Sequence, residues 1–249
     1  DTIAVRSRAA LLVAPEGDAI SHWTAARLWG GIVPDDEWTH VALMHDVRLR
    51  GGGIRPHRFR HLLDVRRWQG IRLTSPLQTF CHLARHLGLV DLVVLGDSLV
   101  RKGRFSPADV ISYATAWEGQ RRAEAVAAAR LVRSHVDSRP ESTLRLLMVL
   151  AGFPEPEVDI RIHDDEGHLL FRLDLGYRTV RVAIEYDGRW HGTAERTAHD
   201  AARRAHLGES EGWRFIVVTA DELYGGTEAL LERLSCQLAA AGLALPRTR

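Results

Sequence analysis

Cysteine, lysine and long apolar runs are scarce in this chain of 249 residues. Its two cysteines, Cys81 and Cys236, lie far apart and show neither a CxxC pattern nor a Cys/His metal spacing, which excludes a disulfide scaffold and a cysteine-based metal motif. The most apolar run, residues 89–100, is interrupted by Asp91 and Asp97 and falls short of the ~20 residues of a membrane span. No signal-peptide pattern opens the sequence. We therefore expect a cytoplasmic protein with no membrane partner.

The charges balance overall but are distributed unevenly along the chain. Hydrophobic residues make up 45% and charged residues 26%, which is typical of a globular protein long enough for two domains. Residues 1–136 carry 19 lysines and arginines against 13 acidic residues, a net charge of +6, whereas residues 137–249 carry 14 against 19, a net charge of −5. This asymmetry predicts a basic domain over residues 1–136, for a nucleic acid or another partner, joined to a metal-binding domain over residues 137–249.

Helices dominate the expected structure of residues 1–136. Three are capped by Ser21, Ser75 and Ser106, others are expected near residues 90–100 and 120–136, and a short strand is expected at 41–44. Residues 48–61 are interpreted as a glycine-rich basic loop, which either holds phosphate groups or is solvated surface. The candidate nucleic-acid-binding residues of this loop are Arg48, Arg50, Arg55, Arg58 and Arg60.

Helices and strands alternate in the second half. A helix over residues 141–151 is followed by three strands, over 158–162, 169–175 and 180–186, the first two joined by a turn at 164–167. A helix over 194–211, a strand over 214–218 and a helix over 221–241 complete the order αβββαβα. This order predicts an α/β fold in which helices cover a sheet.

Carboxylates gather where two of these strands end. Asp174 lies near the end of the second strand, and Glu185 and Asp187 lie at the end of the third. Glu141, in the first turn of the preceding helix, is a fourth candidate. Carboxylates that converge on one point repel one another unless a divalent cation neutralises them, and oxygen ligands suit Mg²⁺ or Mn²⁺. The expected cofactor is therefore Mg²⁺ or Mn²⁺, held by Asp174, Glu185 and Glu141.

Each of these residues also has a purely structural interpretation. Asp187 and Gly188 form a common turn pair, Asp174 can cap a loop, and Glu141 suits the positive end of a helix dipole. His191 is a further candidate, as a metal ligand or as the base that activates water. One helical face carries Asp200, Arg203, Arg204 and Leu207, and an arginine of this face either contacts a phosphate group or pairs with Asp200.

Residues 138–241 share a set of motifs with a known nuclease superfamily. These motifs are Glu141, Phe171-Arg-Leu-Asp174, Ile184-Glu-Tyr-Asp-Gly-Arg-Trp-His191, Asp200-x-x-Arg203-x-x-x-Leu207 and Gly212-Trp-Arg-Phe-Ile-Val-Val218. With the order of helices and strands, they resemble the PD-(D/E)xK superfamily and more closely its branch of Vsr-like endonucleases. The resemblance implies a restriction-endonuclease-like αβββαβ core with a mixed sheet and a metal-dependent DNA endonuclease acting in DNA repair or defence.

The resemblance also assigns roles to residues. It makes Asp174 and Glu185 the central metal ligands, with Glu141 assisting. Asp187 stands where the superfamily's name places lysine, and the second half contains no lysine at all. Vsr-like sequences share this departure, with an Asp and a His instead. The general base is therefore open between His191, a carboxylate with a raised pKa, and the metal ion's own water.

Residues 1–136 more loosely resemble the middle region of AbiEi-type antitoxin-like proteins, in which a winged helix precedes the part that aligns. No convincing helix-turn-helix pair is visible in this sequence. This second resemblance implies an alternative function, a non-catalytic DNA-binding regulator with a nuclease-derived domain and a toxin or other protein as its partner. DNA is the expected ligand under both interpretations.

Overall fold

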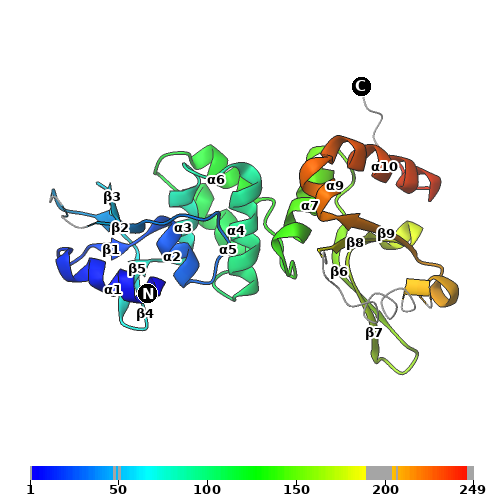
Figure 1. Cartoon of the computed structure of the whole chain (residues 1–249), viewed down its shortest axis with the longest axis horizontal. Coiled ribbons are helices and arrows are strands. Elements are labelled where there is room, and N and C mark those ends of the chain that lie inside the picture. The colour runs from blue at the N-terminus through cyan, green and yellow to red at the C-terminus, as the bar shows by residue number, and fades with distance from the viewer. Residues whose placement is uncertain (1, 47–48, 50–51, 189–203, 206, 246–249) are drawn as a thin grey trace. The chain divides into compact units, whose positions relative to one another are not determined.

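The computed structural model describes residues 2–46, 49, 52–188, 204–205 and 207–245. The chain divides into two compact units, unit 1 over residues 1–139 and unit 2 over residues 140–249, and each is described separately (Figure 1). The described residues form a mixed α/β fold, with a five-stranded mixed sheet in unit 1 and a four-stranded mixed sheet in unit 2. Within these residues no helix is both long and apolar enough to span a membrane.

Unit 1 combines a five-stranded sheet with helices, of which α1 and α2 pack against the strands. The strands lie in the order β3-β2-β1-β5-β4, and β3 runs parallel to β2 at one edge. The strands are β1 (Ala19–Ile20), β2 (Thr39–Leu43), β3 (Ile54–Arg58), β4 (Val65–Trp68) and β5 (Ile71–Thr74). The helices are α1 (Ile3–Val13), α2 (His22–Leu28), α3 (Pro76–Leu83), α4 (Leu89–Arg101), α5 (Pro107–Ala116) and α6 (Arg122–Ala129).

Two of the caps expected in unit 1 are confirmed. The Ser75 hydroxyl accepts a hydrogen bond from the backbone N–H of Gln78 at the start of α3. At the start of α5, Ser106 and Asp109 form a reciprocal capping box. In both helices a proline occupies the first turn, where its missing N–H has no partner to lose. These local signals set the starts of α3 and α5.

The first half of the chain contains more strand than its sequence predicts. The interpretation of residues 48–61 as a basic loop is wrong for residues 54–58, which form β3. Pro56 lies in this strand and donates no hydrogen bond, which an edge strand tolerates. The helix expected over residues 120–136 is also shorter, because α6 ends at Ala129.

Unit 2 follows the predicted order closely. The helices are α7 (Arg139–Leu150), α9 (Ala220–Gly225) and α10 (Thr227–Ala240), and the strands are β6 (Glu157–His163), β7 (Leu169–Tyr177), β8 (Val182–Asp187) and β9 (Arg214–Thr219). The sheet has the order β6-β7-β8-β9, with β8 and β9 parallel. The sequence predicts a single final helix, but the structure has two, α9 and α10, which are separated at Gly226. The helix expected over residues 194–211 falls mostly outside the described residues, of which 204–205 and 207–211 are helical.

Two hydrophobic clusters hold the sheet of unit 2. One joins Val182 and Ile184 of β8 to buried side chains of α7, α9 and α10. The other joins Ala183 to Leu207 and Trp213. Because successive side chains of a strand point to opposite faces, Glu185 lies on the face of Ala183. A Cβ on Gly176 of β7 would lie 2.6 Å from the carbonyl oxygen of Val182, so only glycine permits this close pairing of β7 and β8.

Candidate metal centre

The antiparallel pairing of β7 and β8 brings two of the predicted carboxylates to the same place. Leu175 of β7 lies opposite Ile184 of β8. Asp174 and Glu185 are the next residues of the two strands, one step beyond that pair, and Glu185 lies close enough for its charge to act on the Asp174 carboxyl group. Asp174 is half-buried, and Glu185 is 7% exposed. The two strands thus bring two acidic groups within range of each other's charge.

The pKa of Asp174 reflects its buried and acidic surroundings. Burial, followed by the negative charges of Glu141 and Glu185, raises the pKa of Asp174 from 3.8 to about 7. Arg172 and a hydrogen bond from the backbone of Tyr186 act in the opposite direction and do not offset it. Glu141 of α7 therefore belongs to the same electrostatic group as the two strand carboxylates. The helix supplies the third acid that the sequence places there.

Glu185 has a cationic partner from the helical segment that covers its face of the sheet. The Nε of Arg204 donates a hydrogen bond of 2.9 Å to Oε2 of Glu185. This ion pair is mostly shielded, since the Arg204 side chain is 23% exposed and that of Glu185 is 9% exposed. Sequence reasoning placed Arg204 on the functional face of its helix but could not single it out from Arg203. The hydrogen bond to Glu185 now identifies Arg204 as part of the site.

Of the remaining predicted residues of unit 2, the structure describes Asp187. Asp187 is the last residue of β8, is half-buried and lies opposite Thr219 of β9. His191 and Arg203 lie outside the described residues, so their predicted roles rest on the sequence. Asp187 and Glu185 are separated by one residue and share a face of the strand. Asp187 is thus directed to the same side of the sheet as the acidic group.

The donor set of this acidic group fits a hard divalent cation. Glu141, Asp174 and Glu185 offer only carboxylate oxygens, which Mg²⁺ and Mn²⁺ prefer. Burial contributes most to the raised pKa of Asp174, and the negative charges of Glu141 and Glu185, which a cation would offset, add to it. Asp174, Glu185 and Glu141 are therefore suited to hold such an ion.

The basic residues predicted in unit 1 lie on and after its edge strand. Arg55 and Arg58 belong to β3 and Arg60 follows it, and all three are exposed. Arg58 also forms an ion pair of 3.3 Å with Asp46. Arg48 and Arg50 lie outside the described residues. The exposed arginines of this segment therefore lie on and just after an edge strand.

Sequence reasoning missed a second group of functional character, in unit 1. His22, His57 and His86 bring ligand nitrogens within 4.8 Å of one another. Their separations along the chain match no metal motif, because each comes from a different element. The only signal available was the number of histidines in the chain, 13. That number alone gives no pairing.

The fold and the acidic group define a two-unit α/β protein with carboxylates from one helix and two adjacent strands. The chain is 30% identical over 229 residues to the uncharacterized protein Rv2248 of Mycobacterium tuberculosis (strain ATCC 25618 / H37Rv), a match that covers 89% of this chain and 81% of the relative. The uncharacterized protein MT2308 of Mycobacterium tuberculosis (strain CDC 1551 / Oshkosh) matches with the same identity and coverage. This chain belongs to the family of Rv2248 and MT2308. Neither a family model nor a solved structure matches the sequence.

Proposed function

We propose that this protein is a cytoplasmic, Mg²⁺- or Mn²⁺-dependent DNA endonuclease of the PD-(D/E)xK superfamily, closest to its Vsr-like branch. The observation that carries the proposal is the carboxyl group of Asp174, whose pKa of about 7 reflects burial beside Glu141 and Glu185. The order of α7, β6, β7, β8 and β9 supports the restriction-endonuclease-like core that the motifs imply. Both supports are independent of the charge of unit 1.

The residues of the acidic group have distinct roles in this proposal. Asp174 and Glu185 hold the metal ion, and Glu141 assists. When bound, Mg²⁺ or Mn²⁺ supplies positive charge for a phosphodiester oxygen and acidifies a water molecule. Arg204 fixes the orientation of the Glu185 carboxylate through their hydrogen bond. Asp187 or His191 positions the attacking water or accepts its proton, and an arginine of the 203–204 pair offsets charge that develops on the phosphate.

Cleavage of supercoiled plasmid DNA tests this proposal most directly. We expect nicked and linear products in Mg²⁺ or Mn²⁺ and none in excess EDTA. Full activity in excess EDTA would exclude a metal-dependent mechanism. A purified chain that binds DNA but never cleaves it, with either metal, would instead favour the regulator described next.

The exposed arginines on and after β3 favour a second function, a non-catalytic DNA-binding regulator of the antitoxin-like type with a toxin as partner. Arg55, Arg58 and Arg60 are available to phosphates under both functions. Replacing all three by alanine should weaken binding to duplex DNA of every sequence and reduce the slope of log K against log salt by ~0.9 for each phosphate that is no longer neutralised. Arg104→Ala is the control, because this arginine packs against Trp29 and donates to its carbonyl. An unchanged slope would show that these arginines do not bind DNA.

The pH dependence of cleavage tests the role of His191. If this residue is the base, His191→Ala should reduce the rate by about 10²–10⁴-fold and remove an acidic limb near pH 6–7, because a protonated imidazole cannot accept a proton. If it is a metal ligand, higher Mn²⁺ should partly restore the rate and the limb should shift. Rate and profile are measured on plasmid DNA across the pH range. A variant identical to wild type would leave Asp187 as the preferred base.

A further inference from the structure

Six of the 13 histidines of the chain meet in one cluster of unit 1. They come from α2, β2, β3, α3 and the residues that follow β3 and α3. The cluster consists of His22, His40, His57, His61, His82 and His86. Its rings contact one another and the aromatic side chains of Trp23, Phe59 and Trp117. Nothing in the proposed nuclease activity uses this cluster.

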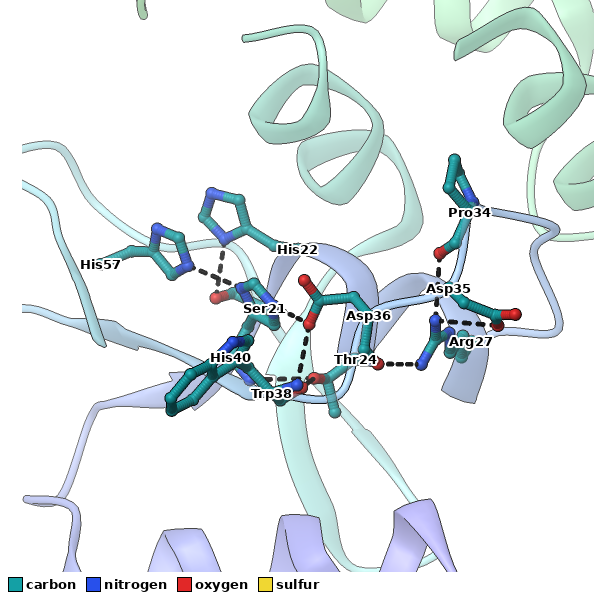
Figure 2. A network of polar contacts seen from close by, with 10 residues as sticks. All are labelled: Ser21, His22, Thr24, Arg27, Pro34, Asp35, Asp36, Trp38, His40 and His57. Carbon is teal, nitrogen blue, oxygen red and sulfur yellow. Dashed lines mark hydrogen bonds and ion pairs between the residues drawn. The ribbon is translucent and has the colours of Figure 1, made fainter. Parts of the chain in front are cut away.

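Three of the histidines form a group with metal-ligand geometry. Ring nitrogens of His22, His57 and His86 all lie within 4.8 Å of one another. His22 is the first residue of α2, His57 lies in β3, and His86 follows the end of α3, so the group links three separate elements. His22 is buried and His86 is exposed, which leaves an approach from solvent to one side of the group. Figure 2 shows the rings of His22 and His57 side by side.

A chain of hydrogen bonds prepares His57 to act as a ligand. Asp36 accepts from Nε2 of His40 at 2.8 Å, since a carboxylate can only accept (Figure 2). Nδ1 of His40 therefore carries the lone pair, and Nε2 of His57 donates to it at 2.8 Å. This leaves the lone pair of His57 on Nδ1. Carboxylate and histidine partners fix metal-binding imidazoles in the same way in known metal sites.

Of the other rings, some have a nitrogen available for a metal ion and others only hold the ligands in place. Nδ1 of His22 lies 2.9 Å from the Ser21 hydroxyl, which leaves Nε2 as its available nitrogen (Figure 2). Both ring nitrogens of His40 are engaged by Asp36 and His57, so His40 supports the group and does not ligate. The centroid of the His86 ring lies 5.3 Å from the ring centroid of His22 and 5.3 Å from that of Trp23. An indole beside the solvent-exposed imidazole limits how far that ring can turn away.

We propose that His22, His57 and His86 bind a transition-metal ion of the Zn²⁺ class. Imidazole nitrogen suits Zn²⁺, Co²⁺, Ni²⁺ and Cu²⁺ and not Mg²⁺ or Ca²⁺. Ligand nitrogens on a tetrahedral ion lie ~3.4 Å apart for bonds of ~2.05 Å, so nitrogens as much as 4.8 Å apart must come closer when the ion binds. The stack of His22 on His57, with centroids 3.7 Å apart, must open as one ring turns toward the ion. The bound ion then ties α2 and β3 to the segment between α3 and α4.

The electrostatic environment keeps these rings in the form that binds metal. Burial, followed by the neighbouring histidines, lowers the pKa of His22 well below 6.5, and burial also lowers the pKa of His57, to about 3. Burial and the nearby Arg85 and Arg55 lower the pKa of His86 as well. All three rings are thus neutral near pH 7 and offer lone pairs. Arg55 opposes a cation and Asp36 favours one.

Titration of the full chain with Co²⁺ in excess Mg²⁺ tests this site. Excess Mg²⁺ occupies oxygen-only sites and does not compete for imidazole. We expect one equivalent of Co²⁺ to bind and to give the intense visible absorption of tetrahedral Co²⁺. His86→Gln, which changes an exposed side chain, should weaken binding at least ~100-fold, and Asp36→Asn, which changes only a supporting group, ~10–100-fold.

The matched control is His168→Gln, in an exposed hairpin turn of unit 2 whose Asp164, Glu166 and His168 form the other described group with ligand spacing. Its Co²⁺ binding should equal that of the wild type. Zn²⁺ should also raise the Tm of the wild-type chain and not that of His86→Gln. Absence of Co²⁺ binding by the wild type, equal binding by His86→Gln, or loss of binding in His168→Gln would overturn the proposal. This experiment does not measure nuclease activity, so the result of the Co²⁺ titration is independent of the proposed function.

Discussion

Replacing Asp174 by asparagine is expected to abolish DNA cleavage and, at the same time, to stabilise the metal-free protein at alkaline pH. Asparagine keeps the shape of the side chain, and its carbonyl can still accept the hydrogen bond from the backbone of Tyr186. It removes one of the three charges that would hold the proposed metal ion. Loss of a central electrostatic group typically costs at least ~10²-fold in rate.

The gain in stability follows from the pKa of Asp174. This pKa is about 7 in the folded chain and 3.8 without the burial and the charges of Glu141 and Glu185. Because the folded-state pKa is raised, the stabilising contribution of the protonated form is complete below 3.8 and is lost as the pH rises through 7. Near pH 8 the ionised group therefore destabilises the fold by about 2–4 kcal/mol, which asparagine avoids.

Hydrogen exchange of the β7 and β8 amides in EDTA measures this effect within unit 2. The matched control is Asp165→Asn, which removes the same charge from an exposed turn and should change stability by less than ~0.5 kcal/mol. Mg²⁺ should stabilise the wild type and leave Asp174→Asn unchanged. If Asp174→Asn is less stable than the wild type near pH 8, Asp174 has a structural role and the metal-centre interpretation fails.

The order of elements in unit 2 could be predicted because its signals are local. Each strand alternates or is continuously apolar, and the turn between β6 and β7 carries Gly167, whose φ is +86°. Asp174 and Glu185 could be selected as candidates from their places in consecutive strands, but their relative position depends on the antiparallel pairing of β7 with β8. The ion pair between Arg204 and Glu185 could not be predicted, since it depends on how a helix lies on the sheet.

Unit 1 was harder to predict because its elements are short and depend on distant partners. β1 has only 2 residues, and β3 contains Pro56 after a run of glycines. The first helix, α1, was missed because its apolar residues do not gather on one face, and Leu12 is 87% exposed. The histidine cluster also depends on distant partners and could not be predicted. The parallel pairing of β3 with β2 is what brings His57 within hydrogen-bonding distance of His40.

The same cluster should make unit 1 sensitive to acid in EDTA. Burial is the main cause that lowers the pKa of His57 and of His82 from 6.5 to about 3. The unfolded chain takes up protons on these rings below 6.5, whereas the folded chain does not, so stability is present above that pH and is lost as the pH falls toward 3. Between pH 7 and 5.5 the two rings together should lower the free energy of unfolding by about 2.5 kcal/mol.

The charges around the two rings do not reverse this direction. His40, His86 and Arg55 add to the lowering at His57, and His61, His57 and His86 add to it at His82. Asp36 alone opposes it at His57, and burial of that ring outweighs Asp36. Asp174 has the opposite dependence, because unit 2 loses stability as the pH rises through 7. Over the same pH range, acid should therefore weaken unit 1 and strengthen unit 2.

Hydrogen exchange of the metal-free chain separates the two responses. Amides of β2 and α3 report on unit 1, and amides of β7 and β8 report on unit 2. His82→Phe, which replaces a ring stacked on Phe59 by another aromatic ring, should halve the acid dependence of unit 1 attributed to His57 and His82. The readout is the slope against pH, so a uniform cost of repacking does not affect it. A slope in unit 1 that His82→Phe leaves unchanged would show that the buried ring already carries a proton in the folded chain.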